Sequence, residues 1–93
     1  MKISYDPAKR QDALDRHGCD FDDAPKVFRG FTLTWPDDRK DYGELREITV
    51  GMVDLTVCVV VWTDRVDTRR IISMRKASKD ERQYYFEEYE QSG

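Results

Sequence analysis

Arginines near the end of the sequence are the first candidates for chemistry. Residues 65–82 contain seven cations against three anions, namely Arg65, Arg69, Arg70, Arg75, Lys76, Lys79 and Arg82 against Asp67, Asp80 and Glu81. Alternation in this segment indicates a strand with Arg70 and Arg75 on opposite faces, and the strand leads into a helix start. Arginine binds phosphate bidentately, and a helix start attracts anions. The pattern is compatible with a phosphate site, but on spacing alone arginines on a strand of this kind are more often solvated surface residues.

Arg46 and His17 are further candidates outside this segment. Arg46 begins an alternating run that ends at Met52, and its side chain is expected on the same face as the apolar groups of that run. An unpaired cation there costs on the order of several kcal/mol, so Arg46 needs a ligand or a partner such as Glu44. His17 lies in the last turn of the first expected helix, where it either titrates in a functional role or packs and caps the helix end.

These residue types fit RNA cleavage better than other hydrolytic chemistry. The sequence contains no glycine-rich phosphate loop, no His/Cys cluster and no Ser-His-Asp spacing. RNA cleavage needs none of these, because the 2′-hydroxyl can attack the adjacent phosphate once a base removes its proton. Cations then stabilise the phosphoryl oxygens, and an acid protonates the leaving 5′-oxygen. The sequence supplies all of these groups, but spacing alone does not show whether the fold brings them together.

Local signals predict the elements that position these groups. Asp6-Pro7 opens a helix and Gly18 closes it, which gives a helix at 7–17 after a short strand at 2–5. The polar segment 37–43 is expected to be a mobile loop. Further elements are a short helix at 20–28 and strands at 31–35, 46–52, 55–62 and 69–75. The strand at 55–62 is apolar on both faces, so we expect it at the centre of the sheet.

A final helix and the short connections complete the predicted fold. Ser78 and Glu81 form a capping box at the start of this helix, which is expected to present Tyr85, Phe86 and Tyr89 to the sheet. Short connections between strands favour antiparallel pairing. The sequence therefore predicts an α+β fold in which a small antiparallel sheet of about four strands carries two N-terminal helices and one C-terminal helix.

The composition limits the classes of protein that fit. Charged residues make up 38% and hydrophobic residues 39% of the chain, which is enough apolar material for a folded domain. The net charge of −3 gives no overall attraction to nucleic acid, so an RNA-binding surface must be local. The sequence shows neither a signal peptide nor a membrane-spanning run, so we expect a cytoplasmic protein. Cys19 and Cys58 lack metal or redox spacing, so no metal or cofactor is expected.

Four segments of the sequence together resemble the BrnT family of bacterial toxins. They are Tyr5-Asp6-Pro7-Ala8-Lys9, Arg16-His17-Gly18-Cys19-Asp20-Phe21, Glu44-Leu45-Arg46-Glu47-Ile48-Thr49-Val50-Gly51 and Arg70-Ile71-Ile72-Ser73-Met74-Arg75-Lys76-Ala77-Ser78-Lys79-Asp80-Glu81-Arg82. They occur in the order of the family pattern and cover nearly the whole chain, and the last segment is the most specific. The resemblance implies a single BrnT-like toxin domain over residues 1–93 with a RelE-like fold.

The resemblance also implies a function and partners. It implies a type II toxin, a ribonuclease that arrests translation without a metal ion and is held inactive by a BrnA-type antitoxin. That antitoxin is a ribbon-helix-helix protein, so the toxin contacts operator DNA only through it. Whether two toxin chains pair within the complex stays open. So does the alternative of a binding module or co-repressor subunit without catalytic activity.

Site residues follow from the resemblance together with the residue types. We expect His17 to act as general acid or base, and Arg46 and Arg75 to stabilise the phosphate that is attacked. Further cations are expected to contact the RNA backbone, and these are Lys9, Arg70, Lys76 and Arg82.

Overall fold

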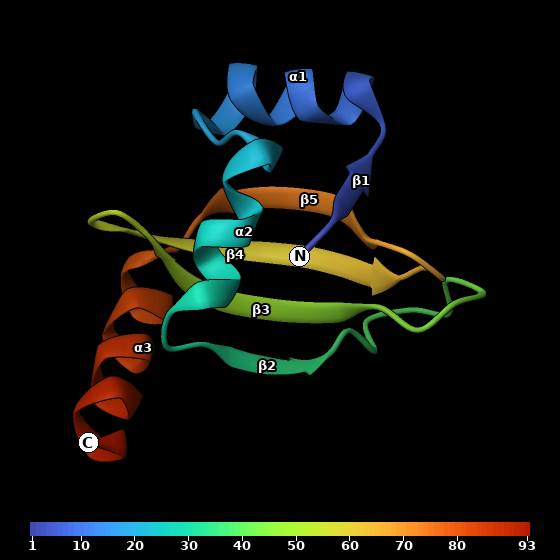
Figure 1. Ribbon diagram of the computed structural model, residues 1–93. Coiled ribbons are helices and arrows are strands. Elements are labelled where there is room, and N and C mark those ends of the chain that lie inside the picture. The colour runs from blue at the N-terminus through green and yellow to red at the C-terminus, as the bar shows by residue number, and fades with distance from the viewer.

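The computed structural model describes residues 1–93 as a five-stranded sheet with helices on both faces (Figure 1). The strands are β1 (Ile3–Tyr5), β2 (Leu33–Pro36), β3 (Glu47–Val53), β4 (Thr56–Asp64) and β5 (Arg69–Lys76), and the helices are α1 (Pro7–His17), the 3₁₀ turn η1 (Phe21–Asp23), α2 (Ala24–Arg29) and α3 (Lys79–Ser92). The strand order is β1-β5-β4-β3-β2. The predicted α+β class is confirmed, but the sheet is mixed and has five strands.

The parallel strand β1 explains this difference from the predicted sheet. Ile3 pairs with Arg69 and Tyr5 with Ile71, so the first and the last strands of the chain lie side by side. The rule that short connections favour antiparallel pairing does not apply to segments so far apart in the sequence. Beyond Ile71 no strand pairs with the outer edge of β5, and α1 packs against β5 instead.

The helix boundaries agree with the local signals in the sequence. The Asp6 carboxylate caps the start of α1, and Gly18 ends this helix in the left-handed conformation with a φ of 64°. Ser78 and Glu81 form the expected capping box at the start of α3. His17 is therefore fixed in the last turn of α1, as predicted.

A bulge in β5 decides which way its arginines point. The register between β4 and β5 shifts midway along the pair, so that Arg70 lies opposite Thr63 and Arg75 lies opposite Val59. Residues opposite each other share a face of the sheet, and so do alternate residues of β4. Arg70 and Arg75 therefore lie on one face. The prediction that Arg70 and Arg75 lie on opposite faces is therefore wrong. A bulge adds one residue to a strand, so the alternation of side chains is inverted beyond it.

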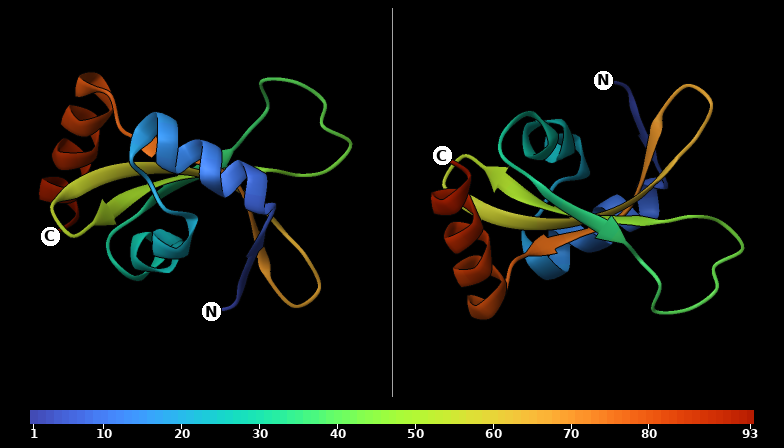
Figure 2. Two further views of the ribbon diagram at one scale, coloured as in Figure 1. Left: turned by 90° about the horizontal axis from the view of Figure 1, so that it is seen from above. Right: turned by 90° about the horizontal axis from the view of Figure 1, so that it is seen from below.

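The two faces of the sheet carry separate cores. On one face, Phe21 of η1 and Val27 of α2 are buried in a cluster that includes Val60 of the sheet. On the other face, Tyr85 of α3 packs against Val57 and Val59. Figure 2 shows α2 and α3 on opposite sides of the sheet. The central strand β4 is buried on both faces, as its apolar run predicts. None of the helices combines the length and apolar character that a bilayer crossing requires.

The last helix buries less of its aromatic surface than predicted. Tyr85 is buried and donates a hydrogen bond from its hydroxyl to the Phe31 carbonyl at 2.7 Å. Phe86 and Tyr89 remain 42% and 55% exposed. The prediction that all three rings pack on the sheet is wrong for these two. The reason is that α3 stands at one end of the sheet and extends past β2 (Figure 1).

A close approach between β3 and α2 makes Gly51 sensitive to substitution. A Cβ at this position would lie 2.9 Å from both Cγ1 and the carbonyl oxygen of Val27. We expect Gly51→Ala to lower the free energy of unfolding by about 1–3 kcal/mol, because the backbone of α2 must move. Urea unfolding measures this. Gly30→Ala is the control, since its Cβ meets nothing within 4 Å, and equal midpoints for the two variants would contradict the close approach.

Candidate active site

The part of the sheet that α3 leaves uncovered carries several arginines. Figure 2 shows α3 and the loop 37–46 on the same side of the sheet, at its two ends. Between them lie Arg70 and Arg75 from β5, which pair with residues of β4. Arg46 precedes β3 and alternates with its residues toward the same side. The loop contributes Arg39, which shares a hollow with Arg75. We call this surface the arginine face, and it consists of Arg39, Arg46, Arg70 and Arg75.

A hollow of about 310 Å³ lies on the arginine face between Arg39 and Arg75. We call it the sheet hollow. Aliphatic side chains of β3 and β4 form part of its lining, and Trp35, Ser73 and Glu81 add an aromatic ring, a hydroxyl and a carboxylate. RNA-binding sites commonly combine an aromatic platform for a base with cations for the backbone. The sheet hollow is therefore suited to a nucleotide.

A second hollow, of about 320 Å³, lies between α1 and β5. We call it the edge hollow. Lys9, Asp12 and His17 of α1 line one side of it, and Ser73 and Arg75 of β5 line the other. Because Ser73 and Arg75 line both hollows, they form the ridge between the two. The structure thus brings together three of the residues predicted from the sequence, which are Lys9, His17 and Arg75.

Arg75 is oriented by a carboxylate of α3. Its two terminal nitrogens donate to the two carboxylate oxygens of Glu81 at 2.7 and 2.8 Å, and Glu81 also accepts from the Ser78 backbone N–H. The hydrogen bonds from Arg75 lower the pKa of Glu81 to about 2, and the same pairing raises the pKa of Arg75. The Nε of Arg75 donates no hydrogen bond within the chain, so it remains available to an incoming anion.

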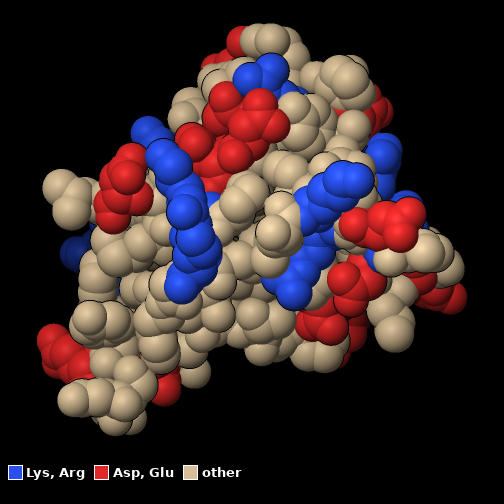
Figure 3. Space-filling model, in the orientation of Figure 1, with Lys and Arg blue, Asp and Glu red and all other residues tan.

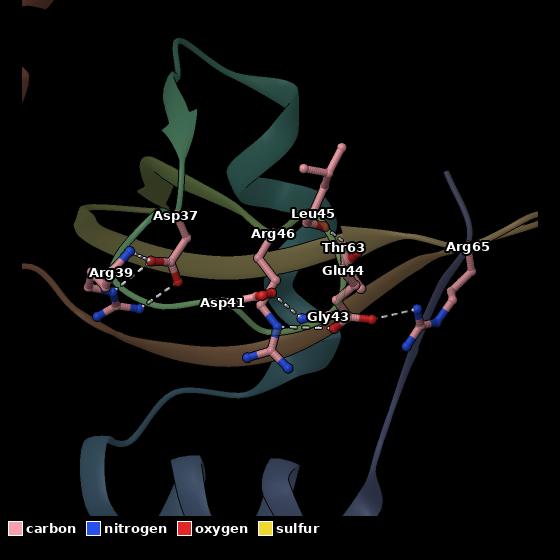
Figure 4. A network of polar contacts seen from close by, with 9 residues as sticks. All are labelled: Asp37, Arg39, Asp41, Gly43, Glu44, Leu45, Arg46, Thr63 and Arg65. Carbon is pink, nitrogen blue, oxygen red and sulfur yellow. Dashed lines mark hydrogen bonds and ion pairs between the residues drawn. The ribbon is translucent and has the colours of Figure 1, made fainter.

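Arg46 is oriented in a similar way at the other end of the arginine face. Its Nε donates to Glu44 at 3.0 Å, and its guanidinium carbon lies 4.2 Å from the centre of the Tyr42 ring. Glu44 also accepts from Arg65 at 2.9 Å, and these two arginines lower the pKa of Glu44. Figure 4 shows the terminal nitrogens of Arg46 pointing away from Glu44. The ion pair with Glu44, which the sequence offered as an alternative, is present.

Arg46 and Arg75 share a face of the sheet but no hollow. Arg75 lies opposite Val59, which lies opposite Val50, four residues after Arg46. At about 3.3 Å per residue and about 4.8 Å per strand, their backbones lie roughly 13 Å apart along the strands and roughly 10 Å across them. This spacing suits contacts to different phosphates of one strand. The arginine that shares a hollow with Arg75 is Arg39 rather than Arg46.

The remaining predicted RNA contacts are divided between the two faces. Lys76 pairs with Cys58, which is buried on the face of α1 and α2, so Lys76 projects from the side opposite the arginine face. Arg82 lies in the first turn of α3 and donates to the Ala77 carbonyl at 3.1 Å. Arg70 makes no ion pair. On the face that carries α2, cations and carboxylates lie interspersed without a continuous basic patch (Figure 3).

The loop 37–46 is anchored at both ends, which sequence reasoning missed. The Asp37 side chain is fully buried and accepts from Nε and Nη2 of Arg39, both at 2.7 Å. Its backbone N–H donates to the Arg46 carbonyl at 2.8 Å, and the Thr63 hydroxyl donates to the Leu45 carbonyl at 2.6 Å (Figure 4). The sequence signal that could have indicated this anchor is an aspartate two residues before an arginine in a turn.

Replacing Asp37 by asparagine tests this anchor. We expect Asp37→Asn to lower the free energy of unfolding by about 1–2 kcal/mol at pH 7, because it removes the charged acceptor of Arg39. Arg39 lowers the pKa of Asp37 from 3.8 to about 2, so the stabilisation is complete above about pH 5 and is lost as the pH falls toward 2.

Urea unfolding at pH 7 and pH 3 measures the difference between Asp37→Asn and the unsubstituted protein. This difference should shrink at pH 3. Asp38→Asn is the control at an exposed neighbouring position, and it should change stability by less than about 0.5 kcal/mol. A difference for Asp37→Asn that does not vary with pH would contradict the assignment.

Comparison with known families identifies the class of protein. A family model described as "Ribonuclease toxin, BrnT, of type II toxin-antitoxin system" matches residues 5–81. The class is therefore that of the ribonuclease toxins of type II systems, whose partner is a protein antitoxin. Within this class, the chain belongs to the BrnT family, which confirms the resemblance seen in the sequence. None of the curated proteins matches the chain.

Proposed function

We propose that this chain is an endoribonuclease toxin that cleaves RNA in the edge hollow without a metal ion and thereby arrests translation. The observation that carries this proposal is that Lys9, His17 and Arg75 line one hollow. A histidine and two cations are the groups that attack by a 2′-hydroxyl requires. Membership of a ribonuclease toxin family supports the same activity.

In the proposed reaction, the 2′-oxygen attacks the adjacent phosphorus and the bond from phosphorus to the 5′-oxygen breaks. The products are a 2′,3′-cyclic phosphate and a free 5′-hydroxyl. Arg75 and Lys9 stabilise the charge on the phosphoryl oxygens. His17 transfers one of the two protons. Its imidazole is free to contact the RNA, because it makes no hydrogen bond within the chain. Asp12 is the only carboxylate that lines the edge hollow, and we assign it the other proton transfer.

The arginine face then holds the RNA on one side of the cleaved bond. A single strand leaves the edge hollow over the ridge formed by Ser73 and Arg75 and enters the sheet hollow. There Trp35, which is 41% exposed, offers a base a stacking surface. Arg39, Arg46 and Arg70 neutralise successive phosphates. In this proposal Lys76 and Arg82 make only peripheral contacts with the backbone.

We also infer the type of antitoxin from the family resemblance. The partner is a BrnA-type ribbon-helix-helix protein, and the complex contacts operator DNA through that protein. The support for this inference is the family membership of the toxin.

Incubation of the purified chain with labelled RNA in EDTA tests the proposed activity. We expect cleavage to a 2′,3′-cyclic phosphate, and no cleavage at a nucleotide whose 2′-hydroxyl is replaced by hydrogen. We also expect expression of the chain alone to stop growth. Cleavage that appears only after Mg²⁺ is added would contradict metal independence. RNA that stays intact under both conditions would favour the binding module without catalytic activity.

A further inference from the structure

A groove of about 810 Å³ lies between the edge strand β2 and the helix α3. Residues 32–35 line one side of this groove, and Asp80, Glu81 and Tyr84 line the other. We call it the β2–α3 groove. Figure 1 shows β2 as the last strand of the sheet, with α3 beside its beginning. The proposed catalytic residues of the edge hollow do not line this groove.

The strand side of the groove is an open sheet edge. Leu33 and Trp35 pair with Val50 and Ile48 of β3, and no strand pairs with the outer side of β2. Unpaired N–H and C=O groups at such an edge can hydrogen-bond an added extended segment. Trp35 and Tyr84, which are 41% and 54% exposed, place aromatic rings within the groove. This edge can therefore pair with a strand and accept apolar side chains at the same time.

The charges around the groove select the kind of occupant. Asp80 lines the groove with an unpaired carboxylate, whereas the carboxylate of Glu81 is paired with Arg75. An adjoining depression on α3 adds Glu87. No lysine or arginine lines either of them. RNA is repelled by such a rim, and a second copy of this chain would bring two acidic rims together. The occupant that fits is an extended protein segment that carries both apolar and cationic side chains.

The groove also shares a wall with the sheet hollow. Trp35 and Glu81 line both of them, and Glu81 orients Arg75 through two hydrogen bonds. A segment that occupies the groove therefore contacts the aromatic ring proposed to stack a base. It also contacts the carboxylate that holds the arginine proposed to bind the phosphate. An occupant of the groove would therefore affect the binding of RNA through these two side chains.

We propose that the antitoxin docks in the β2–α3 groove by adding an extended segment to the outer edge of β2. Its apolar side chains pack on Trp35 and Tyr84, and its Lys or Arg side chains pair with Asp80. The proposal takes the existence of a protein antitoxin from the family. It rests on the proposed function only in explaining how docking blocks the site.

Hydrogen exchange of the free chain and of its complex with the antitoxin from the same operon locates the surface. Backbone amides of residues 32–35 should become at least 10-fold more protected in the complex. Titration calorimetry then measures affinity. We expect Tyr84→Ala and Asp80→Lys each to weaken binding by at least 10-fold, and the affinity of the unsubstituted chain to fall as salt is raised.

Matched controls lie on the same helix outside the groove. Tyr89→Ala removes an equally exposed tyrosine ring, and Glu90→Lys reverses an exposed charge. Both should change affinity by less than 3-fold. Circular dichroism shows whether each variant keeps its helices. Because Tyr84→Ala leaves the charges at the start of α3 unchanged, it remains informative if Asp80→Lys unfolds.

Several outcomes would overturn the proposal. One is that the antitoxin protects backbone amides of α1 and α2 alone from exchange. Another is that the groove variants and their controls bind the antitoxin with equal affinity. A third is that a short RNA or self-association of the chain protects residues 32–35. RNA cleavage is measured separately. If the chain fails to cleave RNA but the antitoxin still protects β2, docking is supported and only the proposed function fails.

Discussion

Arg75→Ala is expected to reduce the rate of RNA cleavage by roughly 10²–10³-fold and to relieve growth arrest. Loss of one preorganised donor to a developing oxyanion typically has an effect of this size. Arg75 lies on the ridge between the two hollows, where its Nε is unpaired. The fold should survive, because the side chain is 44% exposed and the hydrogen bond from the Ser78 N–H to Glu81 remains. Single-turnover cleavage of labelled RNA measures the rate.

Two further variants separate the role of Arg75 from charge in general. Arg75→Lys keeps the charge but loses the planar fork, so its rate should fall between those of the unsubstituted protein and the alanine variant. Arg29→Ala removes an exposed arginine at the end of α2, away from both hollows, and should change the rate by less than about 2-fold. If Arg75→Ala cleaves RNA as fast as Arg29→Ala does, the assignment of Arg75 is wrong.

His17→Gln is expected to reduce cleavage by roughly 10²–10⁴-fold, which is the usual contribution of a positioned acid or base. The substitution keeps a side chain that can form hydrogen bonds at the end of α1, and Gly18 still closes the helix. The fold should therefore be unchanged by circular dichroism. Single-turnover cleavage of labelled RNA measures the rate. A variant that keeps half of the activity would exclude His17 as the proton-transfer group.

Elements whose bounds are set by residues close together in the sequence were predictable. The caps at Asp6, Gly18 and Ser78 act within one turn of the chain, so the helices they bound follow from local spacing. The central position of β4 likewise follows from its continuous apolar run. The parallel pairing of β1 was not predictable in this way, because it joins the first and the last strands of the chain and no connection length indicates it.

The candidate site was predictable only in part, for the same reason. The family pattern indicated His17 and Arg75, and the fold places them with Lys9 around one hollow. The bulge in β5 could not be read from the sequence, because it depends on the register with β4, and it moves Arg70 to the face of Arg75. Arg39 was missed because its position depends on the buried carboxylate of Asp37.

The central claim is that His17 and Arg75 bind the same stretch of RNA backbone. It is tested most directly by NMR titration of the chain with an uncleavable oligonucleotide that carries a single 2′-deoxy substitution. The chain has one histidine, so its imidazole signals are unambiguous. We expect the imidazole signals of His17 and the Nε–H signal of Arg75 to shift with one common dissociation constant, while that of Arg29 stays unchanged. Binding that leaves both His17 and Arg75 unshifted would contradict the account.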